Sequence, residues 1–216
     1  MKRVVAVVLV VAGLVVLGDV VATLVWQEPV SALRAGASQR TLDAEFARLQ
    51  VAVPPLPRQR PSRAALARGA RRLEARTAEG HAAARLRIPR IGLSTIVVRG
   101  STVDDLRKGP GFITGQPLPG RRGTAAIAGH RTTYGAPFRS LDALRPGDPV
   151  EVELPYARMT YRVLSTRIVA PSDLAVLQRA RRDRLVLSAC HPLYSAAKRI
   201  VVTARLASIR APARRA

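Results

Sequence analysis

The longest apolar stretch of the chain lies at its N-terminus. Lys2 and Arg3 are followed by apolar residues through 4–26, interrupted by one acidic residue, Asp19. About 20 apolar residues suffice for a helix to cross a bilayer, and flanking positive charge favours the cytoplasmic side. Residues 1–26 therefore predict a single-pass membrane anchor with a cytoplasmic N-terminus. The alternative is a cleaved signal peptide, whose apolar core is shorter and is followed by a small-residue cleavage site.

A second pattern occupies residues 27–81, which are rich in Arg, Ala and Pro. Leu42, Phe46 and Leu49 recur at helical spacing, so a short amphipathic helix is predicted there. Another helical stretch begins at Ser62. Because it contains few bulky apolar residues, we expect it to be solvated. Together these residues predict an extracytoplasmic stalk between the anchor and a folded domain.

From residue 82 to residue 208 the pattern changes to short apolar runs separated by Gly and Pro. Residues 150–154 alternate between apolar and polar, which is typical of a strand with one wet face. Residues 124–129 form a buried-strand candidate, and residues 173–182 predict a short crossover helix. Strands at short spacing indicate an all-β barrel or sandwich. Residues 209–216 predict a basic C-terminal tail.

The formal net charge is +22, and nearly all of the positive charge comes from arginine. Such a charge ordinarily suggests nucleic acid as a partner. Here the arginines are scattered among alanines, and aromatic residues make up only 4% of the chain. Because the predicted anchor places the charge outside the cell, we expect no nucleic acid. Anionic lipid headgroups and wall polymers are the expected counter-surfaces, and a biased residue composition is the alternative explanation.

The only cysteine of the chain, Cys190, ends the apolar run 185–189. One thiol forms no internal disulfide, which leaves a nucleophile, a metal ligand or an intermolecular link. One cysteine and three widely spaced histidines do not make a typical metal site, so no metal or cofactor is expected. A thiolate reacts where it is exposed and flanked by positive charge. The position of Cys190 between two predicted strands, near Arg199, therefore favours a nucleophile.

Two further residues stand at the ends of predicted strands. His130 follows the run 124–129, and Arg199 opens the run 200–202. Acyl transfer requires three catalytic groups: a thiol nucleophile, a histidine that carries protons and a guanidinium that stabilises the oxyanion. His191 is a rival base, but neighbouring side chains on an extended backbone point in opposite directions, which favours His130. An inert buried cysteine remains the alternative to a reactive one.

Three motifs carry a resemblance to a known family. They are Ala-Gly-His-Arg-Thr-Thr-Tyr-Gly-Ala-Pro-Phe at 128–138, Leu-Ser-Ala-Cys-His-Pro at 187–192, and Lys-Arg-Ile-Val at 198–201. In this order the motifs closely resemble the sortases, and most of all the class E sortases of high-GC Gram-positive bacteria. The resemblance runs from about residue 86 to residue 206. It implies an eight-stranded sortase-type β-barrel with short helices, preceded by a transmembrane helix and a stalk.

By this resemblance, His130, Cys190 and Arg199 take the three catalytic positions of the family. The implied function is a membrane-anchored cysteine transpeptidase that cleaves the Thr-Gly bond of a C-terminal sorting signal similar to Leu-Pro-x-Thr-Gly or Leu-Ala-x-Thr-Gly. The implied partners are surface proteins that bear the signal and a cell-wall precursor or pilin that supplies the accepting amine.

The chain departs from the family pattern in one place. Sortases usually carry Thr-Leu-x-Thr-Cys, whereas residues 186–190 are Val-Leu-Ser-Ala-Cys, so that Ala189 precedes the cysteine. A catalytically weak or inactive sortase-fold module that binds cell-wall or surface proteins is therefore the alternative. A different cell-wall cysteine enzyme, of the L,D-transpeptidase type, expects Ser-x-Gly-Cys, which residues 188–190 do not match.

Overall fold

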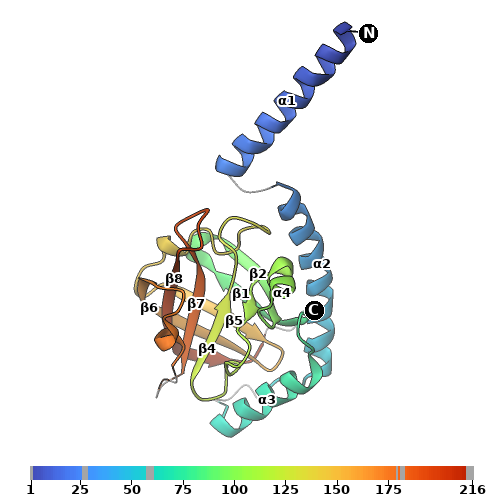
Figure 1. Ribbon diagram of the computed structural model, residues 1–216. Coiled ribbons are helices and arrows are strands. Elements are labelled where there is room, and N and C mark those ends of the chain that lie inside the picture. The colour runs from blue at the N-terminus through green and yellow to red at the C-terminus, as the bar shows by residue number, and fades with distance from the viewer. Residues whose placement is uncertain (1, 26–28, 57–60, 179, 181–182, 213–216) are drawn as a thin grey trace.

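The structure is a computed structural model, and it describes all residues except 1, 26–28, 57–60, 179, 181–182 and 213–216. Helix α1 (Lys2–Val25) extends away from the remainder of the molecule (Figure 1). Helix α2 (Pro29–Ala52) lies along one side of a β-barrel, and helix α3 (Arg63–Arg76) lies beneath that barrel in this view.

Within the described residues, eight strands close into a barrel in the order β1-β2-β3-β4-β7-β8-β6-β5. The strands are β1 (Ala82–Ile88), β2 (Leu93–Arg99), β3 (Gly111–Phe112), β4 (Thr124–Ala128), β5 (Pro149–Leu154), β6 (Ala157–Val169), β7 (Arg184–His191) and β8 (Lys198–Arg210). Four short helical segments connect them: η1 (Pro89–Ile91), α4 (Val103–Lys108), η2 (Leu141–Ala143) and η3 (Leu174–Leu177). The predicted eight-stranded barrel is confirmed.

Alternation along β7 separates the interior of the barrel from its outer face. Leu185, Leu187 and Ala189 belong to the main hydrophobic core. Because successive side chains of a strand point to opposite faces, the residues between them point outward. Val186 accordingly packs in a separate cluster on the outer face. The same alternation decides which chemistry-bearing residues reach solvent.

Helix α2 is fastened to the barrel by both apolar and polar contacts. Phe46 and Leu42 are buried against β1 and β2. The side chain of Gln39 accepts from the N–H of Ile96 at 2.7 Å and donates to the carbonyl of Ile96 at 3.1 Å. One glutamine thereby satisfies both backbone groups of a barrel residue, which fixes the position of α2 along β2.

Helix α3 differs from its prediction, because it is packed rather than solvated. Ser62 caps its N-terminus by accepting from the N–H of Ala65 at 3.2 Å. Leu66 and Leu73 are buried in the main core, and burial of each leucine stabilises the fold by about 1.5–3 kcal/mol. A Cβ at Gly69 would lie 2.7 Å from Cγ of Tyr156. The absence of a side chain at Gly69 therefore lets the helix pack closely against the ring of Tyr156, where any larger residue would clash.

Two further segments differ from the sequence predictions. In the segment 173–182, helical structure is recorded only for η3, and Arg182 lies outside the described residues. The carbonyl of Gln178, just after η3, accepts from Oγ1 of Thr124 on β4 at 2.8 Å. The predicted basic tail, 209–216, begins inside β8, which continues to Arg210.

Across the part of the chain that the structure describes, none of the helices has the length and apolar content that crossing a bilayer requires. Trp26, the last residue of the predicted anchor, lies outside the described residues. The predicted transmembrane helix is therefore not confirmed.

Candidate active site

Strand register brings the three predicted catalytic residues to one end of the barrel. The antiparallel β7–β8 pair places Cys190 opposite Arg199. The parallel β4–β7 pair aligns Ala128 with Ser188, and the N–H of Gly129 donates to the carbonyl of Ser188 at 3.1 Å. His130 follows Ala128 by two residues, as Cys190 follows Ser188, so the register directs both residues to the same end of the two strands. Strand pairing thus joins segments that are sixty positions apart in the sequence.

The side chains of His130 and Cys190 lie on the outer face of the barrel. Cys190 is half-buried and follows Ala189, whose side chain is in the core. A Cβ at Gly129 would lie 2.7 Å from the ring of Phe138, a core residue. Gly129 therefore faces inward, and the next residue, His130, faces outward.

The ring of His130 is partly buried, and one of its two nitrogens lacks a hydrogen-bond partner among the described residues. Nε2 is buried and has no hydrogen-bond partner among the described residues. The ring of Tyr134 lies 5.0 Å from the His130 ring, measured between centroids. Burial lowers the pKa of His130 from its usual 6.5, and the positive charge of Arg107 lowers this pKa further. A buried polar atom without a partner costs free energy, and this arrangement suits a group that exchanges a proton with a bound substrate.

Arg199 is oriented by the backbone of the loop that follows Cys190. Its Nη1 donates to the carbonyls of Ala196, at 2.9 Å, and Lys198, at 3.0 Å. A guanidinium has five N–H donors. The two recorded bonds share one nitrogen, so the cation is positioned opposite Cys190 with further donors on the same rigid plane.

His191 lies on the other side of β7 from Cys190. Its Nδ1 is 3.0 Å from Nη1 of Arg131, whose side chain is buried. A guanidinium can only donate, so Nδ1 of His191 is the acceptor and the ring proton belongs on Nε2. Bound to Arg131 and facing inward, His191 is poorly placed to serve the thiol, which supports the preference for His130.

Sequence reasoning missed two residues next to this site. Arg131 directly follows His130, and His191 directly follows Cys190. This equal spacing was the sequence signal that Arg131 and His191 could contact each other. Ser31 of α2 was not predictable in this way. Its Oγ accepts from the N–H of Tyr134, at 3.0 Å, and thus ties an N-terminal helix to the loop that carries His130.

A sequence profile described as the sortase domain matches residues 86–207. This match covers more than half of the chain. The chain belongs to the sortase family. The family predicted from the three motifs is therefore confirmed.

Two curated relatives are a sortase D from Bacillus subtilis, 32% identical over 114 residues, and sortase SrtE1 from Streptomyces coelicolor, 30% identical over 95 residues. These alignments cover 52% and 40% of this chain, and 56% and 27% of the relatives' own lengths. Among solved structures, a sortase D5 transpeptidase from Clostridium perfringens has a TM-score of 0.65 at 23% identity, covering 80% of this chain and 99% of the other. The last likeness supports the fold.

The outer face of this sortase continues from Cys190 along β4 and β7 to a covered end. There Val186 and Ala126 are covered by Val176 and Leu177 at η3. From Arg184 to Cys190, β7 covers about 20 Å at roughly 3.3 Å per residue.

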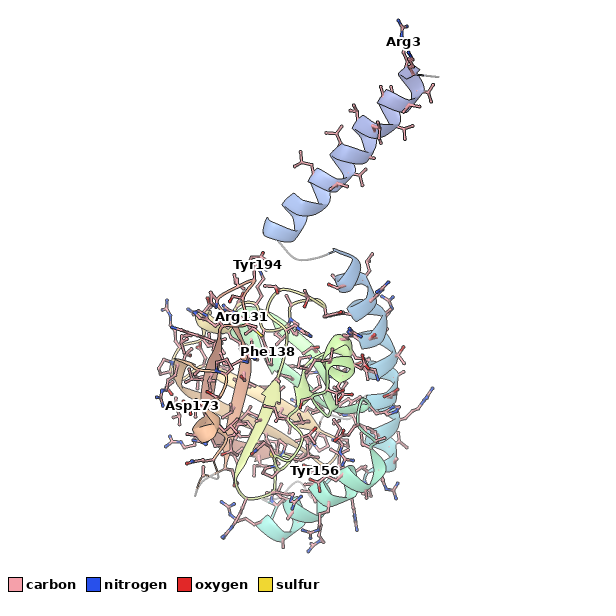
Figure 2. All side chains as sticks on the ribbon, viewed as in Figure 1. Arg3, Arg131, Phe138, Tyr156, Asp173 and Tyr194 are labelled. Carbon is pink, nitrogen blue, oxygen red and sulfur yellow. The ribbon has the colours of Figure 1, made fainter. Side chains whose placement is uncertain are left out.

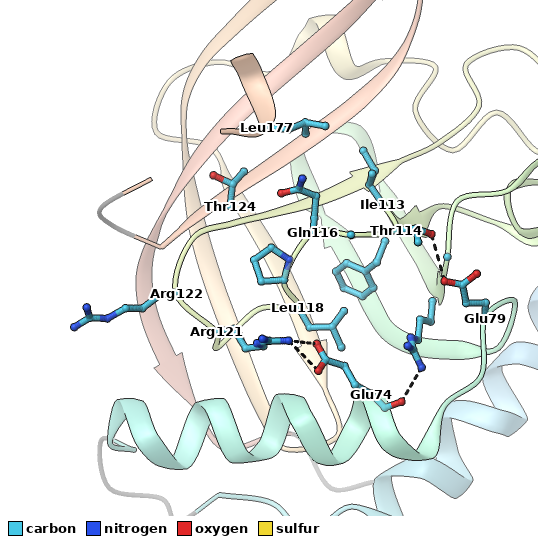
Figure 3. A pocket seen from close by; sticks show the side chains of 15 residues that line it. Glu74, Glu79, Ile113, Thr114, Gln116, Leu118, Arg121, Arg122, Thr124 and Leu177 are labelled. Atoms are coloured by element: carbon cyan, nitrogen blue, oxygen red, sulfur yellow. Dashed lines mark hydrogen bonds and ion pairs between the residues drawn. The ribbon is translucent and has the colours of Figure 1, made fainter. Parts of the chain in front are cut away.

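Beside the covered end lies a cavity of about 630 Å³ (Figure 3). Glu74, Glu79 and Arg121 are among the charged residues that line it. Arg121 pairs with Glu74 at 3.1 Å, and Glu79 lies 3.4 Å from Oγ1 of Thr114. The candidate site thus lies at one end of β4 and β7, and the cavity lies beside the other end of β4, where Thr124 contributes to its lining.

Proposed function

We propose that this sortase is a cysteine transpeptidase in which Cys190 is the nucleophile, His130 is the proton carrier and Arg199 stabilises the oxyanion. The single observation that supports the proposal is the strand register, which pairs Cys190 with Arg199 and pairs Ala128, two residues before His130, with Ser188, two residues before Cys190. A thiol, an imidazole and a guanidinium at one solvent-accessible site are what acyl transfer requires.

In the first step, Sγ of Cys190, as a thiolate, attacks the carbonyl carbon of the threonine in the sorting signal. Arg199 donates hydrogen bonds to the oxyanion that forms. The Thr-Gly carbon–nitrogen bond then breaks, and His130 gives its proton to the departing amine. A lowered pKa makes the imidazolium of His130 a stronger acid, and it also reduces the fraction of His130 that is protonated near neutral pH.

In the second step, an incoming amine attacks the thioester carbon. His130 takes the proton from that amine, and the bond between carbon and Sγ breaks, which returns Cys190 as a thiolate. The proposed acceptor is an amine of a cell-wall precursor or of a pilin lysine. The reaction therefore exchanges one amide for another and consumes no cofactor.

The layout of the outer face supports the proposed substrate class. In a signal of the Leu-Pro-x-Thr-Gly or Leu-Ala-x-Thr-Gly kind, the three residue steps from the leucine to the threonine span about 10 Å when extended. This length fits within the four residue steps, about 13 Å, that separate Cys190 from Val186 at the covered end. The apolar residues Val176 and Leu177 at that end suit the leucine that opens the signal. Surface proteins with such a C-terminal signal are the proposed partners.

Mass spectrometry of the full chain tests this proposal. After incubation with sorting-signal peptides, Cys190 of the wild-type protein should carry the mass of the N-terminal peptide fragment. The Cys190→Ala variant should form no adduct, and its cleavage rate should fall by about 10⁴-fold or more. Equal cleavage by the variant and the wild type would refute the mechanism.

The alternative, an inactive module that binds wall or surface proteins, rests on Ala189. The side chain of Ala189 is 3% exposed and lies in the main core. The hydroxyl that the family pattern places here would therefore point away from the outer face. Labelling of Cys190 with an electrophilic peptide discriminates the two functions, because an inactive module should leave the thiol unmodified.

Membrane anchoring and assignment to class E also stay proposals. The apolar side chains described in α1 are exposed to the extent of 54–67%, as for Val11 and Val4, and have little protein cover. Together with Lys2 and Arg3 they support an anchor with a cytoplasmic N-terminus and an extracytoplasmic catalytic domain. The 30% identity with SrtE1 supports class E.

A further inference from the structure

The two strand ends that carry the proposed nucleophile and proton carrier are joined beneath the outer face. The last ladder pair between β4 and β7 is Ala128 with Ser188, and the backbone bond from Gly129 follows it. One register step beyond His130 and Cys190, Nη1 of Arg131 lies 3.0 Å from Nδ1 of His191. A side-chain bond thus continues the pairing where the described backbone ladder has stopped.

Arg131 is itself fixed at three points. Its Nε donates to the carbonyl of Arg139 at 3.1 Å, and its Nη2 pairs with Oδ2 of Asp142 at 3.0 Å. The guanidinium is almost fully buried, with its side chain 2% exposed, whereas the carboxylate of Asp142 is 59% exposed. Figure 2 shows Arg131 close to the core residue Phe138 at this end of the barrel. A buried cation is costly unless it is fully bonded, so this arginine is unlike the scattered surface arginines of the chain.

We propose that Arg131 and His191 form a positioning pair that sets the distance and orientation of His130 relative to Cys190. Neither residue touches the substrate, because both face inward while their neighbours face outward. The pair acts through the backbone: it locks residue 131 to residue 191, and residues 130 and 190 follow. This inference rests on the proposed roles of His130 and Cys190.

His191→Leu is the central test, because it removes the acceptor and keeps an apolar side chain. Misplacement of reacting groups by about 1 Å costs up to about 10²-fold in rate. We therefore expect kcat for peptide cleavage to fall by about 10-fold to 100-fold, with KM within about two-fold of the wild-type value. A fall of less than two-fold in kcat would overturn the proposal.

His191→Asn provides the conservative rescue. Asparagine places an amide oxygen near the position of Nδ1, so it can still accept from Arg131. Its kcat should recover to within about three-fold of wild type. If the Asn and Leu variants lose the same rate, the acceptor is not what positions the site. His81→Leu is the matched control, because His81 is exposed and pairs with Glu45 on α2; its kcat should be unchanged.

Arg131→Lys tests the other partner. Lysine keeps the positive charge but lacks the rigid fork that reaches the three acceptors together. We expect a loss of kcat at least as large as in His191→Leu, because Arg131→Lys also weakens the bonds to Arg139 and Asp142. When the two changes are combined, the loss should be smaller than the sum of the single losses, because both variants remove the bond between residues 131 and 191. Additive losses would overturn the assignment of a single pair.

A second readout does not depend on peptide turnover. The alkylation rate of Cys190 by iodoacetamide is measured with and without the His130→Ala change, in the wild-type and His191→Leu backgrounds. If the pair positions His130, the effect of His130→Ala on alkylation should shrink at least three-fold in the His191→Leu background. An unchanged effect overturns the positioning role. If the wild type cleaves no peptide but His191→Leu still reduces the effect of His130→Ala on alkylation, only the proposed function is refuted, and the positioning pair stands.

Discussion

At one end of the β4–β7 pair, the side chain of Arg184 donates to oxygens of Thr124, Val176 and Gln178 at 2.7–3.1 Å. At the other end, Nε2 of His130 is buried with no partner among the described residues. The two ends belong to the same strands and share one outer face. At the Arg184 end, the polar groups form hydrogen bonds with one another. At the His130 end, Nε2 is left without a partner among the described residues.

If the proposed function holds, this difference separates residues that hold the fold from residues that perform chemistry. Bonds between the strands and the η3 segment at the Arg184 end pair the carbonyls of Val176 and Gln178 and hold the wall of the outer face in place. The thiol and imidazole at the His130 end need unoccupied hydrogen-bonding positions, so they are placed from beneath, by backbone register and by inward-facing neighbours. A change at one end should therefore alter stability, and a change at the other end should alter rate.

Among the changes that test this comparison, Arg199→Ala is expected to have the largest effect. Loss of an oxyanion donor costs about 10²–10³ in kcat, while the free energy of unfolding should change by no more than about 0.5 kcal/mol at this partly exposed position. Steady-state cleavage kinetics and urea denaturation measure the two quantities. The matched control is Arg205→Ala. Arg205 is an exposed arginine on β8, the strand that carries Arg199, and it pairs with Arg184 of β7. If both variants lose equal activity, the two ends do not differ as argued.

A smaller effect of the opposite kind is expected for Arg184→Met. The change removes three hydrogen bonds and leaves the carbonyl of Val176 without its donor, whereas the carbonyl of Gln178 still accepts from Thr124. The free energy of unfolding should therefore fall by about 1–3 kcal/mol. Because η3 forms the wall of the outer face, KM for the peptide should rise several-fold with kcat nearly unchanged. Thr124→Val, which loses fewer bonds, should show the same trend more weakly. A drop in kcat like that of Arg199→Ala would contradict the separation.

The smallest effect concerns the pH dependence of stability. Burial lowers the pKa of His130 in the folded state below its unfolded value near 6.5, so the unfolded chain takes up a proton at a higher pH than the folded protein. Stability should therefore fall as the pH decreases through 6.5 toward the folded pKa. His130→Gln removes this contribution, which denaturation midpoints at pH 7.5 and 5.5 measure. The contribution of His130 would be absent if the variant and the wild type lost equal stability between these two values.

The motifs around His130, Cys190 and Arg199 determined the family from sequence alone, because short runs with fixed turn and strand residues carry both the register and the chemistry. Alternation along β7 was also readable from the residues, so strand periodicity by itself favoured His130 over His191. The strand pattern further determined an all-β class, and the resemblance supplied its eight strands.

Only the tertiary structure decided how Arg131 and the N-terminal helices are used. Arg131 is one of many arginines in the sequence, and its three partners come from two separate segments: Arg139 and Asp142 follow it in the chain, whereas His191 lies sixty residues away on β7. Helix α3 looked too weakly apolar to pack, but Gly69 lets Tyr156 approach closely enough to bury Leu66 and Leu73. The local sequence determines the periodicity of each element and the chemistry of its side chains. The burial of a side chain depends on which segments pack against it, and this is decided only when the barrel closes.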